Sequence, residues 1–154
     1  MKKQGFTLIE LLAVIVILAV IALISTPLIT NTIQTSRKNA DRESARSYVS
    51  TVKQKITEAM LEYPNLVVGA GPTNATGDAV REWACTNCSA DNKVKIEFTG
   101  TAPQKATLSW TDEGEVTGML KYVNGCWKVV NNGDLEEIAK TTSDTTAKTF
   151  CGYR

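Results

Sequence analysis

The sequence of 154 residues contains no histidine, and its 17 basic residues are balanced by 16 acidic residues. Without histidine, the chain lacks the commonest general base and the commonest metal ligand in proteins. Without a basic stripe, charge gives no support for nucleic-acid binding, which depends on neutralising phosphates. These absences give no support for an enzyme, for a cofactor or metal, or for a specific nucleic-acid partner, and we expect none of them.

Charge is also scarce in the first 29 residues, where an apolar run from Leu11 to Ile24 is unbroken. The segment 6–29 would measure about 36 Å as a helix, enough to cross the ~30 Å hydrocarbon core of a bilayer. Lys2 and Lys3 precede it, and basic flanks stay on the cytoplasmic side. This pattern predicts a single-pass helix in the cytoplasmic membrane, with its N-terminus in the cytoplasm.

Two ordinary explanations of this segment are incomplete. A secretory signal peptide needs small residues of the Ala-x-Ala type at its cleavage site, and the chain instead continues Ser25-Thr26-Pro27. A plain membrane anchor accounts for the length and the flanks but leaves Glu10 unexplained. An ionised carboxylate within a spanning helix costs on the order of 3 kcal/mol, less near the interface.

The residues Gly5-Phe6-Thr7-Leu8-Ile9-Glu10, the aliphatic run and Pro27 resemble the class III leader of type IV pilins and related pseudopilins. In that family a prepilin peptidase cuts after the glycine, here Gly5, and methylates the new amine, here on Phe6. The family's glutamate matches Glu10, and its helix-kinking proline matches Pro27. The close resemblance covers about the first 30 residues.

The resemblance implies a leader peptide at 1–5, followed by a hydrophobic transmembrane and polymerisation helix at 6–29. It implies that Thr7, Glu10 and Pro27 serve assembly, with Glu10 meeting the Phe6 amine of a neighbouring copy. Because a buried cation and a buried carboxylate are each costly alone, such a pair would act mainly as a registry device. The expected partners are further copies in a helical filament, prepilin peptidase, the pilus assembly machinery and the cytoplasmic membrane before assembly.

From residue 30 to residue 63 the pattern becomes amphipathic, with a spacing of three and four that is typical of a helix. Pro27 is expected to kink or locally melt the helix before this point, and Tyr63-Pro64 is expected to end it. The apolar and small residues of the expected stripe are Ile33, Ala40, Ala45, Tyr48, Val49, Val52, Ile56, Ala59, Met60 and Tyr63. The charges from Arg37 to Arg46 indicate a solvated face, with pairing between subunits as a second possibility.

The remaining region, 64–154, is predicted to be a small globular antiparallel β domain whose C-terminal region is closed by a disulfide. The stretch 65–91 shows no period and is expected to be a long loop. Strands are expected at 93–98, around 106–110 and at 116–123, and Asn124-Gly125 predicts a type I′ turn into 126–130. That turn would set Val123 opposite Cys126, turning Cys126 away from the face that packs on the helix.

Four cysteines allow three disulfide connectivities. Cys126 faces outward in this scheme, so a bridge to Cys151 would tie the segment 141–154 over the sheet and contribute on the order of 3 kcal/mol. Such a bridge resembles the disulfide-bounded C-terminal region of type IV pilins. It would leave Cys85 and Cys88 as a local bridge. Zinc at Cys85-x-x-Cys88 and calcium near 131–134 are weaker alternatives, because neither motif is complete.

The sequence thus predicts an α+β fold, with a long N-terminal helix packed on a small antiparallel sheet. The expected function is that of a structural subunit of a type IV pilus-like filament, serving adhesion, motility or DNA uptake and displayed outside the cell. Alternatives are a pseudopilin of a type II secretion or competence system, or a membrane-anchored extracellular binding module. The last would bind its ligand through Trp83, Trp110 and exposed loops.

Overall fold

The computed structural model describes residues 5–65, 71, 75–84, 93–111, 113–130 and 133–154. It divides into an N-terminal unit, residues 1–37, and a C-terminal unit, residues 38–154. Each unit is described by itself.

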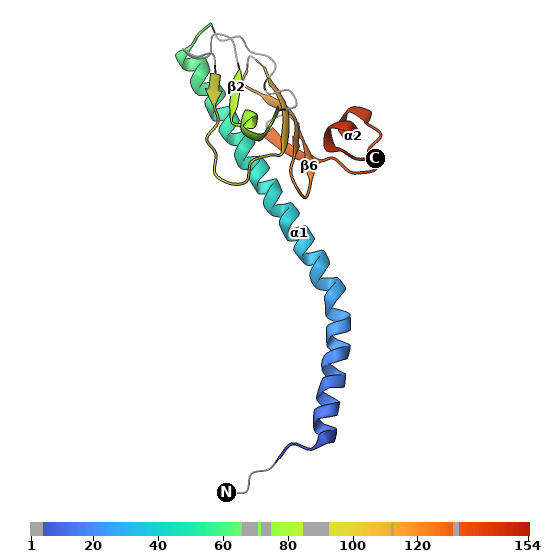
Figure 1. The fold of residues 1–154 in the computed structure, drawn as a ribbon. Helices are drawn as coiled ribbons and strands as arrows, with labels where there is room; N and C mark the ends of the chain where they lie inside the picture. The colour runs from blue at the N-terminus through green and yellow to red at the C-terminus, as the bar shows by residue number, and fades with distance from the viewer. Residues whose placement is uncertain (1–4, 66–70, 72–74, 85–92, 112, 131–132) are drawn as a thin grey trace. The chain divides into compact units, whose positions relative to one another are not determined.

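Helix α1, Leu8–Glu62, runs through both units and ends one residue before the predicted stop at Tyr63 (Figure 1). Its backbone stays helical through position 27. The local melting expected there is therefore not observed, although proline removes one amide donor from the helix.

Within the C-terminal unit, α1 presents one buried stripe to the rest of the chain. Its buried residues are Asp41, Ala45, Tyr48, Val49, Val52, Ile56 and Ala59. The prediction was wrong for Ile33 and Ala40, which are exposed, because the buried stripe begins only at Asp41. The apolar pattern in the sequence therefore begins earlier along the helix than the part that the sheet covers.

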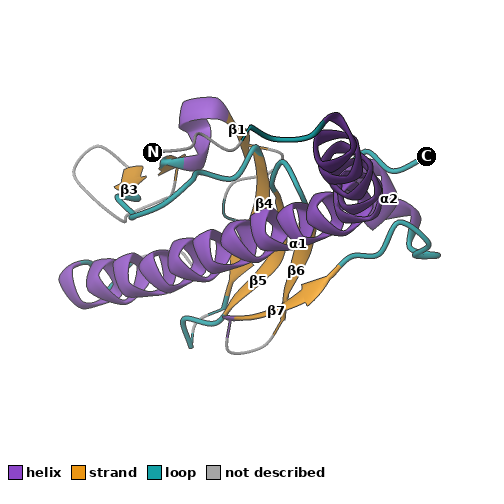
Figure 2. Ribbon diagram, turned by 90° about the horizontal axis from the view of Figure 1, so that it is seen from below, coloured by secondary structure: helices purple, strands orange, loops and turns teal. Residues whose placement is uncertain are grey.

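A five-stranded antiparallel sheet packs on this stripe, with α1 running across its strands (Figure 2). The strand order is β1-β4-β5-β6-β7. The strands are β1 Ala75–Thr76, β4 Lys105–Trp110, β5 Val116–Lys121, β6 Cys126–Val130 and β7 Asp134–Glu137. The predicted α+β architecture, a long helix against a small antiparallel sheet, is confirmed.

Short elements occupy part of the stretch that was expected to be loop. Besides β1, it contains the 3₁₀ turn η1, Gly77–Val80, and strand β2, Glu82–Ala84. Strand β2 pairs with β3, Lys93–Lys95, in a separate two-stranded sheet. These elements are two to four residues long, too short for a period to show in the sequence. Strand β7 was also not predicted.

The main core lies between α1 and the sheet. Alternate residues of β4, β5 and β6 point into it, as strand geometry requires. The strand residues in this core include Ala106, Leu108, Trp110, Val116, Leu120, Trp127 and Val129. Trp83 joins them and stacks on Trp110 at 5.5 Å between ring centroids. The two indoles are only 1% and 5% exposed, so they are not the ligand-binding surface that a binding module would need.

The register of the β5–β6 hairpin differs from the prediction by two residues. Lys121, rather than Val123, lies opposite Cys126, and a four-residue loop, 122–125, connects the strands. Gly125 does not have the positive φ that a type I′ turn requires. A Cβ at that position would lie 2.5 Å from the Trp127 ring. Glycine is needed there for close packing rather than for the turn.

A contact with α1 accounts for this register. The backbone N–H and the side-chain amide of Asn124 both donate to Asp41 Oδ2, each at 2.9 Å. Tyr122 is 2% exposed, and burial raises the pKa of its phenol. Because the shift is two residues, one full period of a strand, every side chain keeps its predicted face.

The opposite face of the sheet carries a second, smaller core under helix α2, Thr145–Cys151. This core contains Cys126, Ile138, Ala147, Phe150 and Cys151. The Asp144 carboxylate caps α2 by accepting from the backbone N–H groups of Thr146 and Ala147.

The predicted disulfide between Cys126 and Cys151 is confirmed, with 5.9 Å between the Cα atoms. The predicted Cys85–Cys88 bridge lies outside the described residues. The disulfide therefore joins the outward face of β6 to α2, as expected for a segment tied over the sheet. That the tied segment forms a helix was not predicted.

Candidate functional site

The candidate site is the start of α1, where Thr7 and Glu10 form a reciprocal cap. The backbone N–H of Thr7 donates to Glu10 Oε2 at 2.9 Å, and the Thr7 hydroxyl donates to the same oxygen at 2.8 Å. In return, the backbone N–H of Glu10 donates to Thr7 Oγ1 at 3.3 Å. This is a capping box, which satisfies amide groups that the first turn of a helix leaves without partners.

The capping box gives Glu10 a local role that sequence reasoning missed. The signal was present, because Thr7-Leu8-Ile9-Glu10 has the Thr-x-x-Glu spacing of that motif and precedes an apolar run. A carboxylate in the first turn also interacts favourably with the positive end of the helix dipole. Glu10 is therefore accommodated within a single chain, before any neighbour is present.

The surface behind this cap is apolar and uncovered. Every residue from Gly5 to Ile24 is exposed in the isolated chain; Leu8 is 83% exposed and Ile15 is 55% exposed. The stretch within α1 is long and apolar enough to cross a membrane. Contiguous apolar surface of this extent marks a site of contact with lipid or protein.

Gly5 and Phe6 precede the helix, and both are exposed. A Cβ added at Gly5 would meet nothing within 4 Å, so nothing in the fold itself demands glycine at this position. Phe6 is 82% exposed. The bond between these residues lies in non-helical, accessible chain, the conformation in which a peptidase can reach it.

The other predicted site residues lie elsewhere. Pro27 is within α1, and the structure describes its backbone but not its side chain. In the charged segment 37–46, Lys38 pairs with Glu137 and Arg46 pairs with Glu43. Asp41 points inward to Asn124. Part of the face that was expected to be solvated therefore makes ion pairs and hydrogen bonds within the chain. Among the described residues, no group of three or more His, Cys, Asp or Glu side chains could hold a metal ion.

Comparison with known proteins finds one match, to a short N-terminal motif. Residues 1–26 match the family model described as the prokaryotic N-terminal methylation motif. The chain carries a class III N-terminal signal. This methylation motif supports a type IV pilin-like or pseudopilin precursor. No curated protein and no solved structure matches the chain.

Proposed function

We propose that this protein is the precursor of a pilus-like filament subunit, which a prepilin peptidase cuts after Gly5 and methylates on Phe6. Its helix anchors it in the cytoplasmic membrane, with the N-terminus in the cytoplasm and the C-terminal unit outside. Assembly then transfers the apolar surface of α1 from lipid to other copies. The observation that carries this proposal is the fully exposed apolar segment, which lies within the matched methylation motif, residues 1–26.

Gly5 supports the proposed processing. The open space around it means that the fold would tolerate a side chain at this position, which leaves recognition by a peptidase as a reason for glycine. Glycine is the residue that the methylation motif places before the cut. Substituting Gly5 by Ser should therefore leave folding unchanged and block cleavage.

Mass spectrometry of the mature N-terminus tests the proposal. We expect a chain that begins with methylated Phe6 in the wild type and an uncut chain for Gly5→Ser. A wild-type chain that still begins at Met1, in cells that contain prepilin peptidase, would overturn the proposal.

The role of Glu10 in assembly is proposed to be the neutralisation of a Phe6 amine on another copy. The capping box complicates its test, because Glu10→Ala removes the charge and the cap together. Glu10→Gln separates them, since an amide oxygen still accepts hydrogen bonds from Thr7 but carries no charge. We expect normal membrane insertion and few filaments for both variants, by electron microscopy. Normal filaments from Glu10→Gln would show that the charge is not required.

The disulfide-closed C-terminal segment supports a pilus subunit over a pseudopilin of a secretion or competence system. Electron microscopy of the material sheared from cells distinguishes the pilus subunit from the pseudopilin. Long surface filaments that contain this chain at normal expression are expected for the pilus subunit. Their absence, together with loss of protein secretion or of DNA uptake in a deletion strain, would favour the pseudopilin.

A further inference from the structure

Two large apolar side chains stand apart from the cores of the C-terminal unit. Among its described residues, only Leu61 and Val123 combine a large apolar side chain with high exposure, at 81% and 70%. Single exposed apolar residues are common on protein surfaces. Leu61 and Val123 differ from ordinary exposed apolar residues in their positions and in the charges near them.

The two residues lie at opposite ends of the length of α1 that packs on the sheet. Val123 is at the tip of the β5–β6 hairpin, next to Asn124, which bonds Asp41 near the start of the buried stripe. Leu61 is in the last turn of α1. The 20 residues from position 41 to position 61 span about 30 Å of helix.

The end that carries Leu61 is acidic. Glu62 closes α1, and the last turn contains no basic residue, although the helix dipole favours a cation there. Gly114, between β4 and β5, lies beside this end, since a Cβ at this position would be 4.0 Å from Thr57 Oγ1. The preceding residue, Glu113, is exposed, and hydrogen bonding with Thr111 lowers the pKa of that carboxyl.

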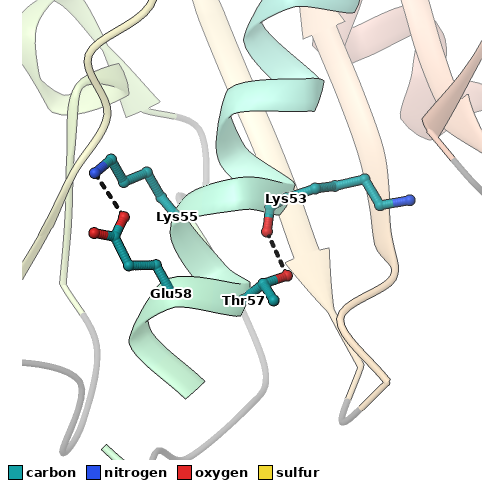
Figure 3. A network of polar contacts seen from close by, with 4 residues as sticks. All are labelled: Lys53, Lys55, Thr57 and Glu58. Atoms are coloured by element: carbon teal, nitrogen blue, oxygen red, sulfur yellow. Dashed lines mark hydrogen bonds and ion pairs between the residues drawn. The ribbon is translucent and has the colours of Figure 1, made fainter. Parts of the chain in front are cut away.

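Figure 3 shows how the nearby lysines are used. Lys55 reaches along α1 to Glu58, with 2.7 Å between Nζ and Oε2, while Lys53 extends in a different direction. Glu62 and Glu113 form no ion pair with any residue that the structure describes. Glu62, which follows Leu61 directly, and Glu113 in the nearby turn are therefore carboxylates without an ion pair at this end of the unit.

The end that carries Val123 has a cation available. Arg42 follows Asp41 directly, is exposed, and makes no ion pair within the described parts of the chain. Lys38 lies one turn earlier and is paired with Glu137. The Asp41 carboxylate at this end is buried against Asn124, so the exposed charge without an ion pair is Arg42 here and carboxylates at the other end. Each end has one exposed apolar side chain.

We propose that the two ends bind each other between copies: the Leu61 end of one subunit packs against the Val123 end of the next, with Glu62 or Glu113 facing Arg42. This inference rests on the proposed filament and names a contact outside its N-terminal helix. Because the two surfaces differ, the contact is heterologous, and such contacts propagate into open assemblies. Opposite charge would also set the polarity of the stack.

Cysteine cross-linking in assembled filaments tests the pairing directly. Two full-length variants, Leu61→Cys and Val123→Cys, are expressed alone and together, and sheared filaments are treated with a short bismaleimide. We expect covalent dimers only from the mixed filaments, because position 61 of one copy meets position 123 of another. Dimers from either single variant, or none from the mixture, would overturn the inference. Thr146→Cys in place of Val123→Cys is the matched control.

A charge exchange gives an independent test. Glu62→Lys with Glu113→Lys, and separately Arg42→Glu, should lower the yield of sheared filaments by about fivefold, the effect of losing an exposed ion pair. Combining all three substitutions should restore the yield. Glu136→Lys, on the exposed edge strand β7, should leave it unchanged. Equal yields from every variant would contradict the proposed contact.

The two proposals fail in different ways. If the wild type forms no filaments although its mature chain begins at Phe6, the proposed filament function fails. If wild-type filaments form normally and the mixed cysteine variants do not cross-link, only the contact between the two ends is wrong.

Discussion

The two units of this chain use apolar residues in opposite ways. In residues 5–24 every residue is exposed, and the helix is apolar on all sides from Leu11 onward. In residues 38–154 the same helix has one apolar stripe, which the sheet covers, and a disulfide ties a second core to the opposite face. The comparison shows one unit that completes its own core and one whose apolar surface nothing within the described chain covers.

The largest expected effect is a loss of stability in the C-terminal unit, which completes its own core. Trp127 is 1% exposed in the main core, so Trp127→Ala should cost about 4 kcal/mol, a large part of the stability of a small domain. Thermal unfolding of the full chain in detergent, followed by near-ultraviolet circular dichroism, measures this. Ile15→Ala is the matched control and should not move the transition. An equal shift from both variants would contradict the division into two units.

The next effect concerns the disulfide. Replacing Cys126 and Cys151 by serine should cost about 3 kcal/mol, because the bridge closes a loop with a sequence separation of 25. Limited proteolysis should then cut first between residues 139 and 151, with β4, β5 and β6 still protected. Simultaneous loss of the whole sheet would mean that the second core is not a separate layer.

A smaller effect is expected at the hairpin contact. Asp41→Ala removes the acceptor of two hydrogen bonds from Asn124 and should cost about 2 kcal/mol. Asp41→Asn keeps one acceptor oxygen and should cost less. Hydrogen exchange at the amide of Asn124 is the direct measurement. Protection that survives in Asp41→Ala would show that another contact sets the register.

The smallest expected effect concerns the capping box at the start of α1, in the N-terminal unit. Thr7→Ala removes the hydroxyl of the capping box and should weaken the first turn of α1 by about 1 kcal/mol, while Thr7→Ser should restore it. Hydrogen exchange of residues 8–11 in detergent reports this, and the unfolding transition of the C-terminal unit should be unchanged. Unaltered exchange in Thr7→Ala would show that the cap is not formed in the protomer.

Much of the architecture could be predicted because it follows from local periods. The apolar run, the stripe from Ala45 to Ala59 and the alternation in β4 to β6 each repeat often enough to be recognised. Four of the missed elements, β1, η1, β2 and β7, have four residues or fewer, and the missed helix α2 has only seven. In the candidate site, the motif located Gly5, Phe6 and Glu10, whereas the Thr7–Glu10 cap was overlooked although its spacing was present.

The sequence by itself determined which side of β5 and β6 is buried and that Cys126 faces away from α1, because a side chain's face depends only on a period of two. It also determined the N-terminal signal, which is a matter of local residue order. The tertiary structure alone decided the hairpin register, since Asp41 is 83 positions from Asn124 in the chain. The turn propensity of Asn124-Gly125 favoured a different pairing, with Val123 opposite Cys126. A buried carboxylate that needs donors outweighs the preference of a two-residue turn, and that need appears only when α1 and the sheet come together.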